Sequence, residues 1–367
     1  MKNRRFLFIG PLPPPIGGET VSTTKLIGSR YWDDAGVNLT TIDMYKGVRI
    51  KLPGEKIDAR DLFRAVRIFI QFIFNLPGKD KVLLWITRRA LCSLGLAVIL
   101  VSRMFRKPVI VKVFGSYLVE QILEYGPIYR RFILSVLSRA ELILPQTKAI
   151  ADGLVMDLGF DESLVVRFPN FLLDRSFSGR REPCSFKGKC LFVGHMKEEK
   201  GVFDIIEALG SKNDASCDFY GELIPKYRER FLKEIGKHDN IEYCGIIEPS
   251  TVIDTIKKYD ILLFPTRHIG EGFPAVILEG LAAGVPIITT EWKSIPDIIE
   301  NEVTGLLIQP ESPEQITGAF DRLAADRELY ETLSSRGYEF AKTFSEKIVV
   351  KDLLIDELLG LNKRNQE

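Results

Sequence analysis

The chain has 367 residues, enough for two domains with separate cores, because domains usually hold about 100–200 residues. Lys and Arg number 50 against 49 Asp and Glu. No run of like charge is present to follow a phosphate backbone, so nucleic acid is not an expected partner. Hydrophobic residues make up 46% of the chain, which excludes a disordered protein. The five cysteines are scattered without a C-x-x-C pair, so we predict no disulfide framework, no zinc site and a cytoplasmic location.

The first half of the chain alternates short apolar runs with helical segments. Such alternation predicts a parallel sheet covered on both faces. The apolar stretch from Leu91 to Phe105 is too short to cross a membrane, which needs about 20 helical residues. The expected strands are Phe6–Ile9, Leu39–Ile42, Val82–Ile86, Val109–Val113 and Leu142–Leu144.

A second alternating run follows a polar, aperiodic stretch. We therefore expect a first Rossmann-like domain over residues 1–170, a linker over 171–188 and a second Rossmann-like domain over 189–345. The closing helix, in 346–367, could return to the first domain. Because doubly wound sheets bind ligands at the carboxyl ends of their strands, we expect an active site between the two domains. The expected strands of the second domain are Cys190–Val193, Cys217–Tyr220, Ile241–Tyr243, Ile261–Phe264 and Pro286–Thr289.

Two loops are typical of phosphate sites. Gly17 and Gly18 follow the first strand and precede a helix, where backbone N–H groups can meet an anion; an ordinary strand-to-helix turn is the alternative. In the second domain Lys200 is expected at the start of a helix, where a cation opposes the helix dipole unless a diphosphate binds. His195, just after the preceding strand, could donate to the same phosphates or serve only the fold.

A third loop carries two glutamates. Glu271 lies in a Gly/Pro loop after a strand, and Glu279 lies on the apolar helix that follows. Carboxylates are rarely buried without a partner, so each is expected to meet a ligand or an internal donor. The backbone N–H groups of Gly272, Phe273 and Ala275 could hold a hydroxyl-rich ligand, whereas Pro274 has none to offer.

Together these motifs resemble the family 4 retaining glycosyltransferases of GT-B fold, over nearly the whole chain. The matching features are Gly17-Gly18, Phe168-Pro169-Asn170, Val193-Gly194 with Lys200-Gly201, Tyr220-Gly221-Glu222, Asp260 before Phe264-Pro265-Thr266, and the Glu271 and Glu279 pair. The resemblance implies two doubly wound Rossmann-like domains facing each other across a cleft.

The resemblance also implies roles for the site residues. Glu279 would bind the ribose of a sugar nucleotide and Ile247 would pack on its base. Glu271 and the loop from Gly272 through Phe273 and Pro274 to Ala275 would hold the donor sugar. Lys200 would neutralise the diphosphate leaving group, with His195, Gly17 and Gly18 also near the donor. The reaction would retain configuration and need no metal or other cofactor.

Two positions depart from the family pattern. His195 stands where the family commonly has Arg, and Lys197 could supply that charge. Phe114 stands where a first-domain His usually faces the sugar or the acceptor, which leaves Lys112, Ser116 and His268 as candidates for acceptor activation.

The resulting functional prediction is a transferase that moves a sugar from a nucleotide-diphosphate sugar to a saccharide or lipid-linked saccharide in building cell-surface polysaccharide or glycolipid. The alternatives are a sugar-nucleotide epimerase, a phosphorylase-like enzyme, or a non-catalytic protein that binds a nucleotide sugar. Arg60, Arg64 and Arg67 share one face of an otherwise apolar helix. That pattern is typical either of a peripheral helix on an anionic membrane or of a helix packed on the sheet.

Overall fold

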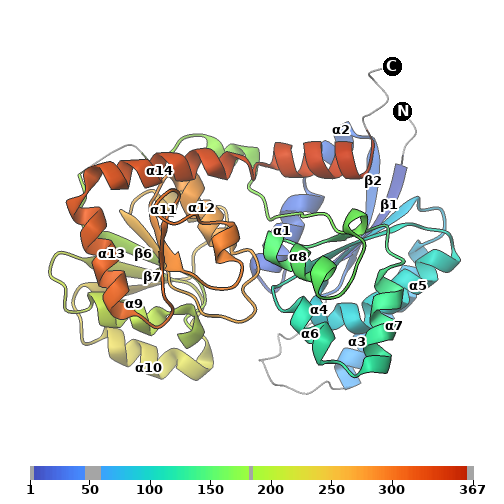
Figure 1. Cartoon of the computed structure of the whole chain (residues 1–367), viewed down its shortest axis with the longest axis horizontal. Coiled ribbons are helices and arrows are strands. Elements are labelled where there is room, and N and C mark those ends of the chain that lie inside the picture. Colours follow the sequence, from blue (N-terminus) through green and yellow to red (C-terminus); the bar gives the residue numbers. More distant parts are fainter. Residues whose placement is uncertain (1–3, 46–58, 182–184, 362–367) are drawn as a thin grey trace. The chain divides into compact units, whose positions relative to one another are not determined.

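The computed structural model describes residues 4–45, 59–181 and 185–361, and the chain divides into two compact units. Unit 1 comprises Met1–Asn170 and Glu346–Glu367, and unit 2 comprises Phe171–Ser345 (Figure 1). The closing helical segment therefore belongs to unit 1. Within the described part of the chain, no helix is long and apolar enough to cross a membrane.

Unit 1 is built on a five-stranded parallel sheet with the order β2-β1-β3-β4-β5. The register pairs Phe6 with Leu39 and Leu83 with Ile110. β1, β3 and β4 are mostly buried and apolar because both faces of the sheet are covered there, whereas the edge strand β2 carries polar, partly exposed residues. The strand bounds are β1 Arg4–Gly10, β2 Val37–Asp43, β3 Lys81–Thr87, β4 Val109–Phe114 and β5 Leu142–Leu144.

The connections between these strands place the helices of unit 1 in two layers. Right-handed crossovers from β2 to β3 and onward to β4 and β5 put α3, α5 and α7 on one face of the sheet and α1 on the other (Figure 1). The helices are α1 Gly18–Ile27, α2 Tyr31–Asp34, α3 Ala59–Asn75, α4 Arg88–Ala90, η1 Leu91–Gly95, α5 Leu96–Met104, α6 Leu118–Glu124, α7 Pro127–Leu137, α8 Lys148–Met156, η2 Glu162–Leu164 and η6 Lys347–Leu358.

Unit 2 holds a six-stranded parallel sheet with the order β11-β10-β9-β6-β7-β8. The strand order reverses between β6 and β9, which pair directly through Cys190 with Ile261 and Leu191 with Leu262. In sheets of this kind such a reversal marks the ligand-binding edge. The strands are β6 Lys189–Val193, β7 Ser216–Tyr220, β8 Ile241–Gly245, β9 Ile261–Phe264, β10 Ile287–Thr290 and β11 Leu306–Ile308.

Helices cover both faces of this second sheet. α9 packs against α10 and α13, while α12 packs against α11 and α14. One continuous apolar core fills the space between sheet and helices. The helices are α9 Val202–Leu209, α10 Pro225–Ile235, α11 Val252–Ile256, α12 Ala275–Ala283, α13 Pro313–Ala325 and α14 Arg327–Lys342, with short turns η3 Asp174–Phe177, η4 Glu198–Lys200 and η5 Ile295–Asp297.

The stretch expected to be a linker is instead part of unit 2. Leu172 is buried, and its N–H donates to the Phe344 carbonyl at 2.9 Å. Phe177 and Phe186 pack on the core of the unit. The sequence did not indicate this packing, because Leu172, Phe177 and Phe186 are separated by polar residues and lie too far apart to make a periodic pattern.

Two glycines of unit 2 are required by close backbone contacts. Gly201 has φ +75°, and a Cβ there would lie 2.2 Å from the Pro265 oxygen. Gly221 has φ +140°, and its Cβ would lie 1.8 Å from the Gly194 oxygen. Only glycine fits both demands. These contacts fix the loops that follow β6, β7 and β9 against one another.

Candidate functional site

The candidate site lies at the carboxyl ends of β6 and β9, where the sheet of unit 2 reverses its order. The loop after β6 contains Gly194 and His195 and ends in the turn η4, whose last residue is Lys200. The loop after β9 carries Glu271 and leads into α12. The geometry of this edge therefore brings together residues that are 71 positions apart in sequence.

Lys200 and Glu271 form an ion pair at this edge. The Lys200 Nζ donates to Oε2 of Glu271, and the two side chains are only 14% and 10% exposed. The Thr266 hydroxyl donates to the same carboxylate oxygen at 3.0 Å. The ammonium also lies 5.2 Å from the centre of the Phe264 ring. Such a half-enclosed pair keeps a positive and a negative charge at a defined place without full solvation.

Side chains from the next strand hold the Glu271 loop in place. Thr290 Oγ1 donates to the Thr266 carbonyl, and Ser294 Oγ donates to the Gly272 carbonyl. The Trp292 indole donates to the His268 carbonyl at 3.0 Å. These anchors lie at or just after the end of β10, and no sequence motif predicted them. Their only signal was the run of polar residues just after an expected strand.

The segment from Gly272 to Ala275 leads into the start of α12, which has Pro274 at its N-cap. The Phe273 side chain turns into the core, where its ring lies 5.5 Å from that of Phe344. Of the predicted sugar contacts, Phe273 can therefore offer only its backbone. Glu279 lies further along the same helix and is 8% exposed. Glu271 and Glu279 are thus both carried by the loop and helix that follow β9.

Two histidines border the Lys200 and Glu271 pair. The pKa of His195 is lowered first by burial and then by Lys197 and Lys200, against the opposing effect of Glu222 and Glu271. His268 responds in the same way: burial and Lys200 lower its pKa. Both imidazoles are therefore neutral at pH 7, and each can donate one hydrogen bond without adding charge.

Ile247 belongs to unit 2, whereas Gly17 and Gly18 of the first loop belong to unit 1. Ile247 is half-buried and packs against the core of unit 2 just after β8. Gly17 and Gly18 belong to unit 1, at the start of α1. The Gly17 N–H already donates to Thr20 Oγ1 at 3.0 Å, so that group serves the helix cap. Beyond its own helix turn and chain neighbours, no atom of the described chain lies within 4 Å of a Cβ built on Gly18, and its role in donor binding stays a prediction.

The candidates for acceptor activation differ in access. Lys112 is fully buried on β4, with its Nζ 3.5 Å from the Pro169 carbonyl and 4.4 Å from the centre of the Phe168 ring. Burial lowers the pKa of Lys112 to about 7. An amine enclosed in this way cannot reach an acceptor hydroxyl, which removes it as a candidate. Ser116 is also buried, in unit 1, whereas His268 borders the site of unit 2.

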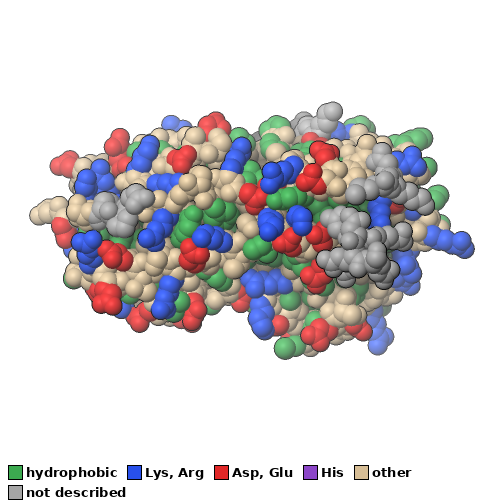
Figure 2. All heavy atoms as spheres, turned by 90° about the horizontal axis from the view of Figure 1, so that it is seen from above, with side chains coloured by type: hydrophobic (Ala, Val, Ile, Leu, Met, Phe, Trp, Pro, Cys, Tyr) green, Lys and Arg blue, Asp and Glu red, His purple; other side chains and the backbone are tan. Residues whose placement is uncertain are grey.

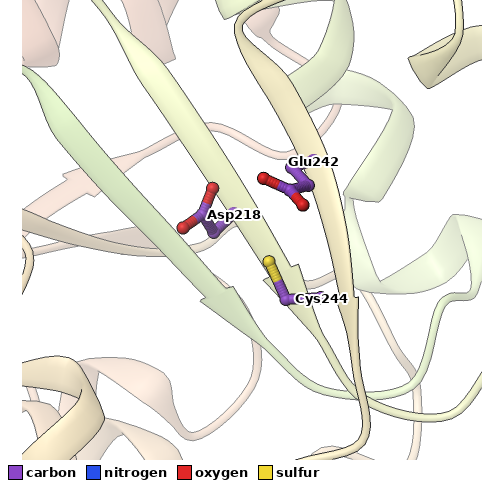
Figure 3. A group of neighbouring side chains, drawn as sticks. All are labelled: Asp218, Glu242 and Cys244. Carbon is purple, nitrogen blue, oxygen red and sulfur yellow. The ribbon is translucent and has the colours of Figure 1, made fainter.

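Among the described residues, one group could supply ligands for a metal ion: Asp218, Glu242 and Cys244 on β7 and β8 (Figure 3). Its ligand atoms lie within 4.8 Å of one another. The Tyr259 hydroxyl donates to Asp218 at 2.6 Å, so this carboxylate already serves the fold. The group lies on the strands themselves rather than in the loops that carry Lys200 and Glu271.

Comparison with known proteins shows what this chain is similar to. Residues 185–340, nearly all of unit 2, match the family model of glycosyl transferases group 1. The HepE protein of Anabaena, solved in complex with UDP, has the same fold with a TM-score of 0.72; at 14% identity the likeness covers 97% of this chain and 99% of that one. The two parallel α/β units are thus those of the GT-B fold.

Curated relatives agree with the family model. An uncharacterized glycosyltransferase of Methanocaldococcus jannaschii is 32% identical over 165 residues, which is 44% of this chain and 45% of that protein. The capsular polysaccharide biosynthesis glycosyltransferase CapM of Staphylococcus aureus is 25% identical over 205 residues, or 53% of each chain. The matches thus span about half the length of these relatives. Over that stretch the chain is similar to group 1 glycosyltransferases.

Proposed function

We propose that this protein is a retaining glycosyltransferase that moves a hexose from a nucleotide-diphosphate sugar to a saccharide or lipid-linked saccharide acceptor. The observation that carries the proposal is the buried pair of Lys200 and Glu271 at the edge where the sheet of unit 2 reverses. The family match over unit 2 and the UDP complex of the Anabaena neighbour support a nucleotide at this edge. The capsule-forming relative supports a role in cell-surface polysaccharide synthesis.

Lys200 would act on the leaving group. When the glycosidic bond to the diphosphate breaks, negative charge grows on the phosphate oxygens, and a fixed ammonium stabilises that charge more than it stabilises the ground state. Glu271 holds the ammonium in position before the donor binds. Because the ion pair is already formed, little reorganisation is needed at the moment of reaction. Loss of one such group typically costs about 10²–10³ in rate.

The carboxylates would hold the sugar nucleotide. Glu279 on α12 would accept hydrogen bonds from ribose hydroxyls, and Glu271 with the backbone of Gly272 to Ala275 would accept and donate hydrogen bonds at the donor sugar. Ile247 would pack on the base. We further propose that no metal is needed, because Lys200 supplies a positive charge at the diphosphate.

We propose that the protein binds a membrane surface, where it would reach a lipid-linked acceptor. The face of α3 with Ile68 and Phe72 is buried, while Phe63 and Phe74 on its outer side are 74% and 80% exposed. Ile128 of α7, a helix of the same layer, is 87% exposed. Arg64 and Arg67 are half-buried along α3, and the side chain of Arg60 lies outside the described residues. An apolar outer face with basic residues suits an anionic bilayer.

The test of the function is nucleoside diphosphate release from a panel of UDP-, GDP- and ADP-sugars, with and without EDTA. We expect one donor to be turned over, with EDTA having no effect and Lys200→Met reducing the rate by about 10²-fold or more. A nucleotide sugar changed without an acceptor would indicate an epimerase. Full activity of Lys200→Met would exclude the proposed role of the lysine.

A further inference from the structure

Unit 2 has a pocket at the ends of its strands opposite to those that carry Lys200 and Glu271. It encloses about 430 Å³ and borders Lys189, the first residue of β6, and Asp260, which immediately precedes β9. The candidate donor site lies at the other ends of these two strands. Because β6 has five residues and each rises about 3.3 Å, the two sites are roughly 15 Å apart along the sheet.

The described residues that line this pocket are all basic except Asp260, and the Asp260 carboxylate is already paired. Arg181 Nη2 donates to Asp260 Oδ1 at 2.5 Å, and the backbone N–H groups of Lys187 and Lys189 both donate to Oδ2 at 2.9 Å. The Asp260 carboxylate therefore neutralises Arg181, and both of its oxygens already accept hydrogen bonds. The basic lining residues are Arg180, Arg181, Lys187, Lys189, Lys257 and Lys258.

Among the described residues, four of these six cations have no counter-charge. Lys257 lies 3.5 Å from the exposed Asp254. Across the described residues, the side chains of Arg180, Lys187, Lys189 and Lys258 make no hydrogen bond or ion pair. Elsewhere on the face of unit 2 that carries α14, acidic and basic side chains are interspersed (Figure 2). Like charges gathered in a concavity repel one another and concentrate anions from solution.

Hydrogen bonds and close backbone packing fix the segment that carries Arg181, Lys187 and Lys189. The Arg181 N–H donates to the Ala283 carbonyl at 2.8 Å, and its Nη1 donates to the Tyr330 hydroxyl at 2.6 Å. Gly188, between the two lysines, has φ +70°, and a Cβ there would lie 1.9 Å from the Asp214 oxygen. Lys187 and Lys189 are therefore anchored at their backbone, so only their side chains need ordering when an anion binds.

We propose that this basic pocket binds a compact, multiply charged phosphate group, carried by a small phosphorylated molecule or by a lipid headgroup. Guanidinium and ammonium groups together suit tetrahedral phosphate oxygens, and several unpaired cations match a group with more than one negative charge. The site is distinct from the proposed donor site and does not depend on glycosyl transfer.

The test is a titration of the ¹⁵N-labelled full chain with inorganic pyrophosphate at low ionic strength, followed by amide chemical shifts. We expect saturable shifts at residues 187–189. The variant Lys187→Gln/Lys189→Gln should weaken this binding at least about tenfold, whereas the control Arg228→Gln/Lys233→Gln on α10 should leave it unchanged. Shifts near Lys200 report the donor site separately, so failure of one site is not mistaken for failure of the other.

A second arm identifies the source of the phosphate by sedimentation with phosphatidic acid vesicles. Sedimentation lost in Lys187→Gln/Lys189→Gln but kept in the α10 control would assign the group to a lipid. Pyrophosphate binding with sedimentation unaffected by that variant would assign it to a soluble molecule. The proposal is overturned if residues 187–189 show no saturable shift and sedimentation with vesicles is the same for the wild type and Lys187→Gln/Lys189→Gln. It is also overturned if the two double variants give the same result in both the titration and the sedimentation experiment.

Discussion

Substitutions in the pair of Lys200 and Glu271 should affect stability and catalysis differently: removing both charges should restore stability but not activity. The two side chains are largely covered, with exposed fractions of only 14% and 10%. Removing one partner of a buried pair leaves an uncompensated charge and typically costs about 3–5 kcal/mol. We therefore expect Lys200→Met and Glu271→Gln each to lower the free energy of unfolding by about 3 kcal/mol. The Gln side-chain oxygen can still accept the Thr266 hydrogen bond.

The double variant removes both charges and should lose far less than the sum of the single changes, with a coupling of at least about 2 kcal/mol. Urea unfolding followed by circular dichroism measures all four proteins at pH 7. Nucleoside diphosphate release should be low in both single variants and should stay low in the double variant, because neutralising the pair does not restore the ammonium. Additive stability losses, or an active double variant, would refute this reasoning.

Three further predictions concern other features of the fold. Lys112→Met should raise the free energy of unfolding at pH 7, because burial lowers the Lys112 pKa from its ordinary value of 10.5 to about 7 in the folded protein. Between pH 7 and 10 the wild type should therefore gain stability relative to the variant, on the order of 1 kcal/mol per pH unit. Equal pH profiles in urea unfolding would contradict this. Gly201→Ala should cost at least about 2 kcal/mol because its φ is +75°, and an unchanged melting midpoint would argue against the tight loop. Phe63→Glu/Phe74→Glu should abolish sedimentation with anionic vesicles at low salt while Met156→Glu, equally exposed on α8, does not; equal sedimentation of both would exclude the outer face of α3.

The sequence predicted the alternating architecture well because each strand is a short apolar run between polar turns. The strands expected at Leu142–Leu144 and Ile261–Phe264 match the structure residue for residue. β11, Leu306–Ile308, was missed although it has the same length as β5; its place in the sheet comes from pairing with β10 rather than from a pattern in the sequence. The helix α8 was missed for a different reason: its Gly153 and Asp152 interrupt an otherwise apolar pattern.

The site was predictable only where its residues sit in recognisable loops. Lys200 and Glu271 each appeared in the sequence as a candidate, but their direct ion pair depends on β6 and β9 being neighbours. The contacts from Thr290 and Ser294 to the Glu271 loop depend in the same way on β10 lying beside β9. The basic pocket was invisible, because Lys187 and Lys258 come together only through the sheet.

The central claim is that a nucleotide diphosphate binds at the edge formed by β6, β9 and α12. Calorimetric titration with UDP, GDP, ADP and CMP in the absence of metal, on wild type and Glu279→Ala, tests it most directly. We predict selective binding of one nucleoside diphosphate, weakened in Glu279→Ala by about 1–3 kcal/mol, the usual cost of losing a charged hydrogen-bond acceptor. Binding of no nucleotide, or equal binding by wild type and Glu279→Ala, would contradict it.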